Sequence, residues 1–525
     1  MSKAIKHAVA YLLLAGFATM LAGACSSSPR ASLGQDDELV GRAHKPLAKP
    51  VELRPGELWY QLVVGSEQMT VRMRLLQPAA RTSFFLPGPW AGQNDFAEDI
   101  SISGASGPMG ALPLTIQRSL GRIDVETPGV AWVELHYTVK LHDKDAERLR
   151  YRSRLRDEVF FAYGPTFLIL PSDGISRLLR DIPVEVRVPA DWEVVTTWRS
   201  AHVGPSKQVP STNVHGFIVD DVRSLRDAFV AAGRQIEAHH LAIGTERMTI
   251  AFEPGFTQRS ALVEAIAAIV AAYSARYGSQ GEVSAFIGAT DRMGPDAMRG
   301  MGRRGGFVLE LPLDVALDDQ TLLLIAHEAF HMWNGHELVP EPVHERQTRW
   351  FKEGLTHYVA LQTLRELGLI EEHTVRAGLA QAAQFYNRNP AIRGVSTAGI
   401  DQVRLPYDQG MLLALKLDVA IRAASGSRLS LKHWLMDLLL KARHAPGHYD
   451  QDALKRSLLG LVGPSGSSLG GIWDRHINRQ VPINVAELFE SIGLHWIEGS
   501  DSSLPRLLPF EAPNSMYGQL FKGPE

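Results

Sequence analysis

Five consecutive residues, His327-Glu-Ala-Phe-His331, combine the side chains of a hydrolytic metal site at a helical spacing. Residues four positions apart on a helix project from the same face, so both histidines could offer an imidazole nitrogen to one metal ion. Downstream, Glu353 could add a carboxylate ligand from a second helix. Three protein ligands leave one coordination position open, which is typical of catalytic zinc. The sequence thus predicts one Zn2+ per chain, with Glu328 beside it as the general base.

The segment around this motif has the composition of a buried helix. An unbroken apolar run, 321–326, precedes it, and Met332 and Trp333 follow it. Two imidazoles and a carboxylate in such a helix would be costly unless they were paired or bound to a metal. The plain alternative is a pair of core histidines whose hydrogen bonds are satisfied within the protein.

Several residues compete to be the third ligand. The polar, proline-bearing connection 334–346 carries most of them, and these are typical of solvated loop charges. Glu353 instead stands among apolar residues, and Gly354 beside it would allow the two metal-binding helices to approach closely. A buried carboxylate needs a counter-charge, which zinc provides, so we predict Glu353. His357 could either support the site or lie on the surface. The other candidates are His336, Glu337, Glu341, His344 and Glu345.

The beginning of the chain predicts export and a lipid anchor. Residues 1–24 contain two lysines and then an apolar stretch, 8–22, that is too short for a membrane span. The stretch ends in Leu-Ala-Gly-Ala-Cys, which resembles a bacterial lipoprotein processing site, where Cys25 would become the mature N-terminus and carry lipid. An ordinary signal peptide cleaved elsewhere is the alternative. By the same resemblance, Ser26 favours the outer membrane, facing the periplasm, with the lipid as the only membrane attachment.

Composition excludes several other classes of protein. Cys25 is the only cysteine, which rules out intramolecular disulfides and cysteine-ligated zinc. A formal charge of −3, without a basic stripe, argues against a nucleic-acid partner. With 45% hydrophobic and 21% charged residues, the chain has the balance of an ordinary globular protein.

The periodicity of apolar residues divides the chain. After a flexible tether, 25–50, the stretch 51–245 alternates apolar and polar residues, as in 133–141. This predicts an antiparallel, sandwich-like β domain. From 246 to 500, a few strands and then mostly helices predict a catalytic domain of the α+β class, followed by a C-terminal tail, 501–525.

Three motifs together resemble the gluzincins, metallopeptidases that join a two-histidine helix to a downstream glutamate. The motifs are His-Glu-Ala-Phe-His-Met-Trp-Asn at 327–334, Trp-Phe-Lys-Glu-Gly-Leu-Thr-His-Tyr at 350–358 and Tyr-Asp-Gln-Gly at 407–410. Within the group they are most similar to the glycyl aminopeptidase family, family sixty-one of the metallopeptidases. The similarity spans roughly 180–500 and implies a thermolysin-like, mainly helical catalytic domain with a small sheet.

The resemblance also suggests roles for residues outside the metal motif. It implies that Tyr407 donates a hydrogen bond to the oxyanion of the reaction intermediate; the alternative is that Tyr407 caps the helix 411–424. A Gly-Gly-Leu-Glu-His stretch expected upstream is absent. Glu310, at the end of Arg-Gly-Gly-Phe-Val-Leu-Glu, is our candidate to bind a substrate ammonium. The stretch 294–306, rich in Gly, Met and Arg, predicts a mobile loop near the site.

These observations predict a zinc-dependent metallopeptidase that acts on peptide substrates, with an aminopeptidase as one form. In this reading Glu328 takes a proton from the zinc-bound water as it attacks the scissile carbonyl. Two alternatives remain open: a non-catalytic envelope lipoprotein with a relic zinc site, and a zinc hydrolase acting on a non-peptide amide or ester. An intact general base speaks against the relic, because a purely structural site has no use for Glu328.

Overall fold

The computed structural model of the chain consists of two compact units, divided after Gln235. The sequence placed this boundary at residue 245. The predicted signal peptide, the tether and Cys25 lie outside the described residues. The structure describes residues 57–143, 151–201, 212–290, 298–389, 401–445, 447–500, 504–509 and 516–523.

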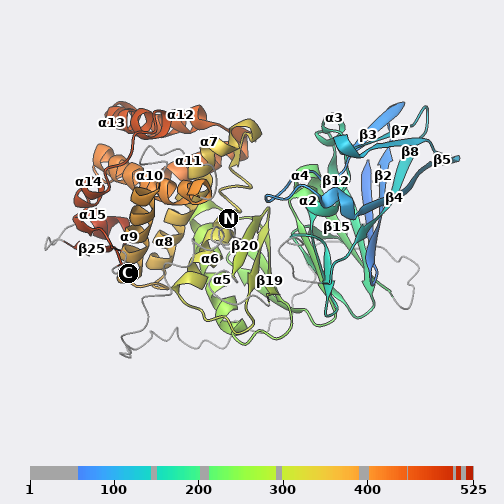
Figure 1. The fold of residues 1–525 in the computed structure, drawn as a ribbon, viewed down its shortest axis with the longest axis horizontal. Helices are drawn as coiled ribbons and strands as arrows, with labels where there is room; N and C mark the ends of the chain where they lie inside the picture. Colours follow the sequence, from blue (N-terminus) through green and yellow to red (C-terminus); the bar gives the residue numbers. More distant parts are fainter. Residues whose placement is uncertain are drawn as a thin grey trace, which may run out of the picture. The chain divides into compact units, whose positions relative to one another are not determined.

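An eight-stranded, largely antiparallel sheet forms the centre of the first unit (Figure 1). The alternation predicted for 133–141 appears in β8 (Trp132–Lys140), where the apolar side chains are buried and belong to the core of this unit. One pair of neighbours, β1 with β12, is parallel. The strands follow the order β14 (Arg199–Ala201), β15 (Thr212–Asp221), β12 (Arg180–Pro189), β1 (Leu58–Val64), β2 (Gln68–Leu76), β8, β4 (Ile100–Gly107), β5 (Gly110–Leu112).

Two four-stranded sheets complete the β unit. The first has the order β13 (Glu193–Thr196), β16 (Phe229–Gly233), β10 (Val159–Tyr163), β9 (Arg154–Arg156). The second has the order β11 (Leu170–Pro171), β3 (Arg81–Phe85), β7 (Arg122–Glu126), β6 (Leu114–Gln117). Short helical turns connect them: η3 (Phe96–Asp99), η4 (Arg118–Leu120), α2 (Gly164–Phe167), α3 (Asp173–Ser176) and α4 (Val222–Arg226).

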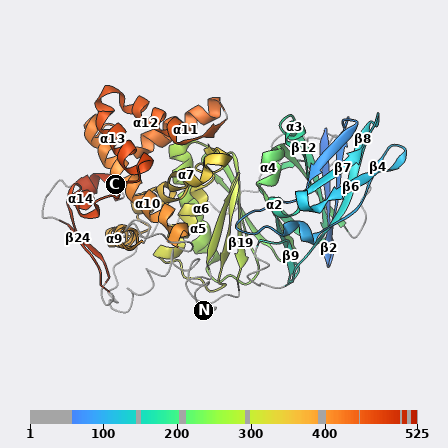
Figure 2. The same ribbon diagram turned by 45° about the horizontal axis from the view of Figure 1, so that its top comes forward.

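The second unit begins with a five-stranded sheet whose last strand is an edge. The helix α5 (Arg259–Tyr277) contacts both this sheet and the helix α6 (Asp319–Phe330), as Figure 2 shows. Among the described residues, α5 alone is long and apolar enough to cross a membrane by length and composition, yet its apolar face belongs to the core. The strand order is β17 (Glu237–Ile243), β18 (Glu246–Phe252), β19 (Glu282–Ala289), β21 (Gly306–Leu311), β20 (Arg299–Arg303).

Helices make up most of the remaining chain, which confirms the predicted α+β class. The helices α8, α9 and α10 contact one another and form the centre of this body (Figure 1). After α6 the helices are α7 (Glu345–Arg349), the π-helix η7 (Trp350–Leu355), α8 (Thr356–Glu366), α9 (Glu372–Arg388), α10 (Asp401–Ser425), α11 (Leu431–His444), α12 (Gln451–Val462), α13 (Ser467–Ile472), the π-helix η9 (Trp473–Asn478), α14 (Val485–Glu490) and α15 (Met516–Leu520). Short 3-10 turns are η6 (Pro342–His344) and η8 (Gly463–Gly466), and short strand pairs are β22 (Val339–Pro340) with β23 (His448–Tyr449) and β24 (Leu494–Ile497) with β25 (Arg506–Pro509).

Candidate metal centre

The helix α6 places both histidines on one face. Its N-cap is Asp318, whose Oδ1 accepts a hydrogen bond from the Thr321 backbone N–H at 2.9 Å. His327 lies in the last turn, and His331 follows the last helical residue with helical backbone angles (φ −61°, ψ −19°). The two buried rings therefore meet at right angles with centroids 4.7 Å apart, as the spacing predicted.

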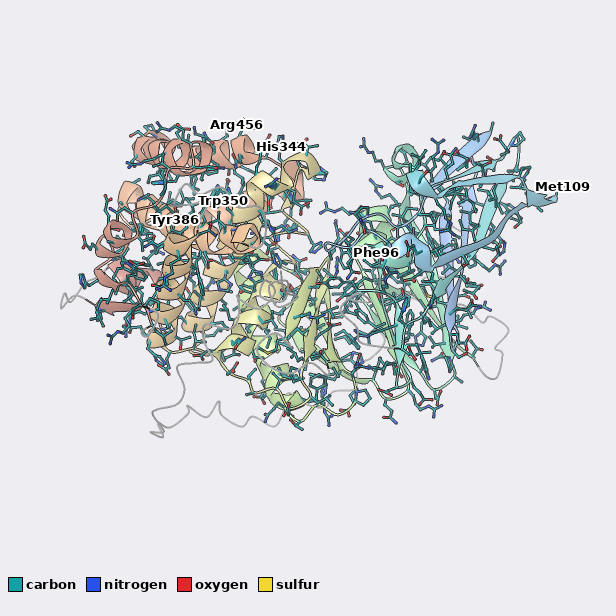
Figure 3. All side chains as sticks on the ribbon, viewed as in Figure 1. Phe96, Met109, His344, Trp350, Tyr386 and Arg456 are labelled. Carbon is teal, nitrogen blue, oxygen red and sulfur yellow. The ribbon has the colours of Figure 1, made fainter. Side chains whose placement is uncertain are left out.

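The third residue, Glu353, lies on a π-helix rather than on the α-helix that the sequence indicated. Short π-helical segments often occur at functional sites. Buried Trp350, labelled in Figure 3, begins this π-helix. Its ring packs against that of Trp473, with centroids 5.8 Å apart. This aromatic contact packs the π-helix into the helical body. The Glu353 carboxylate faces the two histidines from this position.

Gly354 does allow a close helix contact, but the prediction named the wrong partner. A Cβ at Gly354 would lie 2.4 Å from the Gly410 Cα, and one at Gly410 would lie 2.3 Å from the Trp350 carbonyl oxygen. At Gly354 the π-helix therefore packs backbone to backbone against α10. This contact fixes the position of Glu353 relative to the helix that carries Tyr407.

Three ligand atoms converge on one point. The Nε2 atoms of His327 and His331 lie 3.1 Å apart, and each lies 3.5 Å from Oε2 of Glu353. Zinc bonds to nitrogen and oxygen of about 2.0–2.1 Å in a tetrahedral arrangement would separate the ligands by about 3.3 Å. The three residues form the only metal-ligand cluster among the described residues and match the size of a zinc ion.

Hydrogen bonds and nearby charges orient the three ligand residues and keep Glu353 ionised, which favours a bound cation. Nδ1 of His331 lies 2.9 Å from the Asn334 carbonyl oxygen, so it must donate, which leaves Nε2 as the ring nitrogen that could bind a metal. Burial alone would raise the pKa of Glu353, but the His331 charge and hydrogen bonds from both histidines hold it well below its usual range. Burial alone would lower the pKa of His331, but the charge and hydrogen bond of Glu353, together with the Glu328 charge and the Asn334 carbonyl, raise it above its ordinary value. The carboxylate is therefore ionised and would neutralise part of a bound metal's charge.

Glu328 lies against the edge strand β20. Its Oε2 accepts a hydrogen bond from the Gly302 backbone N–H at 2.8 Å. A Cβ at Gly300 would lie 2.1 Å from the Glu328 Cγ, and one at Gly302 would lie 2.3 Å from the His331 Cβ. The strand can lie against α6 only because glycines occupy both positions. The prediction of a mobile loop at 294–306 was therefore wrong for 299–303, which form this strand, while 291–297 lie outside the described residues.

Asn334, which the sequence analysis did not single out, connects the two metal-binding segments. Its main-chain oxygen accepts from His331, as described above. Its side-chain Nδ2, completely buried, donates to the Phe351 carbonyl oxygen at 2.8 Å and contacts the Thr356 hydroxyl at 3.1 Å. One residue thus holds a histidine of α6 and the π-helix of Glu353 in register. A buried asparagine directly after the metal motif was the sequence signal for it.

Replacing Asn334 with alanine is expected to weaken zinc binding about 10- to 100-fold, the usual cost of losing a group that orients metal ligands. The reason is that the π-helix would lose its polar link to α6, while the backbone contact to His331 would remain. Competition between the metal-free protein and a chelator for added zinc measures this effect.

Gln362→Ala is the matched control, because it also removes a completely buried amide from the same unit. Nε2 of Gln362 donates to the Leu520 carbonyl oxygen at 2.9 Å, far along the chain from the metal ligands. We expect this variant to lose thermal stability but to keep its zinc affinity. Unchanged zinc affinity in Asn334→Ala would show that the link is structural only.

Other predicted site residues lie around this centre. The His327 ring has the ring of His357 at 5.6 Å and that of Tyr407 at 5.9 Å, so His357 adjoins a metal ligand instead of lying apart on the surface. Tyr407 lies inside α10, which starts at residue 401, so it is not the cap of a helix that begins at 411. Glu310 lies on β21, and its Oε2 is 3.5 Å from Nη1 of Arg299 on β20.

The competing ligand candidates have other partners. Nε2 of His336 lies 3.0 Å from the Gly302 carbonyl oxygen, and Oε2 of Glu337 accepts from Arg443 at 3.0 Å. Glu345 pairs with Lys352 at 3.1 Å. Glu341 and His344 lie 3.7 Å from each other in the connection before α7.

Comparison with known proteins supports the assignment that this geometry suggests. Residues 320–404 match the model of the M61 glycyl aminopeptidase family, and no curated protein matches the sequence. An aminopeptidase N family protein from Idiomarina loihiensis has a similar structure, with a TM-score of 0.69 at 18% identity over 85% of this chain and 81% of that chain.

A mutant of an M1 zinc metallopeptidase from Deinococcus radiodurans is also similar, with a TM-score of 0.54 at 14% identity over 82% of this chain and 95% of that one. The same mutant bound to the tripeptide Tyr-Ser-Ala gives 0.53 at 14% identity over 79% and 92%. At these identities the likeness concerns the fold. In its metal-site region the chain is thus similar to the M61 glycyl aminopeptidases, and in its fold it is similar to aminopeptidase N family and M1 zinc metallopeptidase structures, which agrees with the converging His-His-Glu side chains.

Proposed function

We propose that the protein hydrolyses peptide bonds with one zinc ion held by His327, His331 and Glu353. The observation that carries this proposal is the convergence of the three ligand atoms at separations that suit tetrahedral zinc. When bound, zinc supplies Lewis-acid chemistry: it polarises the scissile carbonyl and lowers the pKa of water toward neutrality.

Glu328 acts as the general base. It takes a proton from the attacking water and returns it to the leaving nitrogen. The Gly302 N–H donates to one of its oxygens and so fixes the carboxylate beside the metal ligands, where the other oxygen can reach water. A site kept only for structure would not hold an acid in this position, which disfavours the relic alternative.

Tyr407 donates a hydrogen bond to the developing oxyanion. Burial raises the pKa of its phenol well above the ordinary value, and the charges of Glu353 and Glu328 raise it further. The hydroxyl therefore keeps its proton over the whole working range and remains a donor. A donor placed where negative charge develops stabilises the transition state more than the substrate.

Replacing Tyr407 with phenylalanine is expected to lower kcat by about 10²–10³-fold, the usual effect of one oxyanion donor, with little change in KM. Because the raised pKa of Tyr407 keeps it protonated beyond pH 10, the alkaline limb of the rate profile should be the same in both proteins. Steady-state kinetics across pH test both statements. Wild-type kcat in the variant would remove Tyr407 from the mechanism.

Substrate experiments identify the type of bond that the protein cleaves. Cleavage of a peptide library, with and without chelator, tests peptidase activity against a relic site, and mass spectrometry of the products separates it from hydrolysis of another amide or ester. For an aminopeptidase, we propose Glu310 as the group that binds the substrate ammonium. Products shortened from the N-terminus would support aminopeptidase activity, on which the role of Glu310 depends, and internal cleavage would contradict it.

We also propose that Cys25 carries lipid and holds the protein in the bacterial cell envelope, at the outer membrane and facing the periplasm. The processing-site resemblance before Cys25 supports this proposal. Labelling with radioactive palmitate, followed by membrane fractionation, tests it. Unlabelled protein in the soluble fraction would contradict it.

A further inference from the structure

Arg349 is a cation beside the metal centre. It is the last residue of α7, directly before the π-helix that carries Glu353. Its guanidinium carbon lies 5.9 Å from the ring centroid of Tyr407, and that ring lies 5.9 Å from the ring of His327, a metal ligand. The side chain is partly exposed, so its donors can be reached from solvent.

The charge of Arg349 is not neutralised within the described part of the chain. Neighbouring cations have acidic partners: Lys352 pairs with Glu345 at 3.1 Å, and Arg299 pairs with Glu310 at 3.5 Å. Arg349, by contrast, has no carboxylate within ion-pair distance among the described residues. Its contact with the Tyr407 ring is at the outer limit of about 6 Å for cation–π attraction, so that contact alone gives the charge little compensation.

Three acids around the site already have partners within the protein. Glu353 faces the histidines, Glu328 is the proposed base, and Glu310 shares its carboxylate with Arg299. Each of these three acids thus has a partner within the described site, whereas the Arg349 guanidinium has no acidic partner there. An arginine in this situation suits a ligand carboxylate, because its planar donors match the two oxygens and form charge-assisted hydrogen bonds.

We propose that Arg349 binds a carboxylate of the peptide substrate next to the scissile bond, and that the enzyme prefers peptides that carry one there. The carboxylate is either an acidic side chain or the C-terminal carboxylate of a short peptide. This inference rests on the proposed peptidase function and names the substrate class of the same site.

Two matched peptide series test the proposal on the full zinc-loaded protein. The first exchanges glutamate for glutamine at each position around the bond, and the second exchanges a free C-terminus for an amide. We expect the charged member of at least one pair to have a kcat/KM roughly 10- to 100-fold higher, the range for hydrogen bonds to a charged group. The series that shows this ratio identifies which carboxylate Arg349 binds.

Arg349→Gln should bring that ratio close to one, and Arg349→Glu should reverse the preference toward a lysine at the same position. Arg346→Gln, an exposed arginine on the same helix, should keep the wild-type ratio. A ratio that persists in Arg349→Gln overturns the proposal. So does an equal loss on charged and neutral peptides, which would mean that Arg349 only supports Tyr407.

Failure of this inference differs from failure of the proposed function. If the wild-type protein cleaves neutral, amidated peptides and its charged-to-neutral ratios are close to one, peptidase activity stands and the role of Arg349 falls. If zinc-loaded protein cleaves neither series, the peptidase proposal itself fails.

Discussion

Replacing Glu328 with glutamine is expected to lower kcat/KM by roughly 10²–10⁴-fold, the usual contribution of a general acid–base group, or more if it acts in both proton transfers. The amide has the same shape and can still accept the Gly302 N–H that orients the native side chain at 2.8 Å. It cannot take a proton from water at neutral pH. Geometry is thus preserved while the chemistry is lost, and peptide hydrolysis under single-turnover conditions measures the effect.

Zinc content separates this loss from damage to the metal site. Glu328 is not one of the three residues whose ligand atoms converge, so the variant should bind one equivalent of zinc with wild-type affinity. Metal analysis of the purified variant provides the check. Normal turnover with zinc bound would refute the proposed role of Glu328, and loss of zinc would mean that the residue has a metal-site role instead.

Replacing Glu353 with glutamine is expected to weaken zinc binding by well over 100-fold, more than the loss of a residue that only orients a ligand. The site would lose its single anionic ligand, and a buried divalent ion would face two neutral imidazoles. The pKa of His331 should also fall, because burial lowers it and Glu353 contributes two of the interactions that raise it against burial. Chelator competition at several pH values measures zinc affinity.

Glu345→Gln is the control for Glu353→Gln. Glu345 begins α7, close in sequence to Glu353, but its exposed carboxylate pairs with Lys352 at 3.1 Å and not with the histidines. This variant should keep zinc and activity. If Glu353→Gln instead bound zinc as tightly as the wild-type protein, the third ligand would have to be sought elsewhere.

The metal ligands could be predicted from sequence because their arrangement is mostly local. Two histidines four positions apart on a helix must share a face, whatever else the chain does, and α6 places both rings together. Glu353 was predictable for an energetic reason, since an acid among apolar residues needs a counter-charge, and the structure places its carboxylate 3.5 Å from both histidines. The α+β class followed from equally local periodicities, such as the alternation along β8.

The sequence by itself therefore determined which residues could bind zinc, the candidate base beside them and the class of fold. Tertiary structure alone decided the π-helix under Glu353, its contact with α10 at Gly354 and Gly410, and the strand through Gly300 and Gly302. Tertiary structure also decided the role of Asn334, because its side-chain amide donates to the Phe351 carbonyl oxygen in another segment of the chain. Helical spacing and burial act between near neighbours and leave a pattern in sequence. Backbone packing and long-range hydrogen bonds join residues whose proximity no local pattern records, so they appear only once the chain has folded.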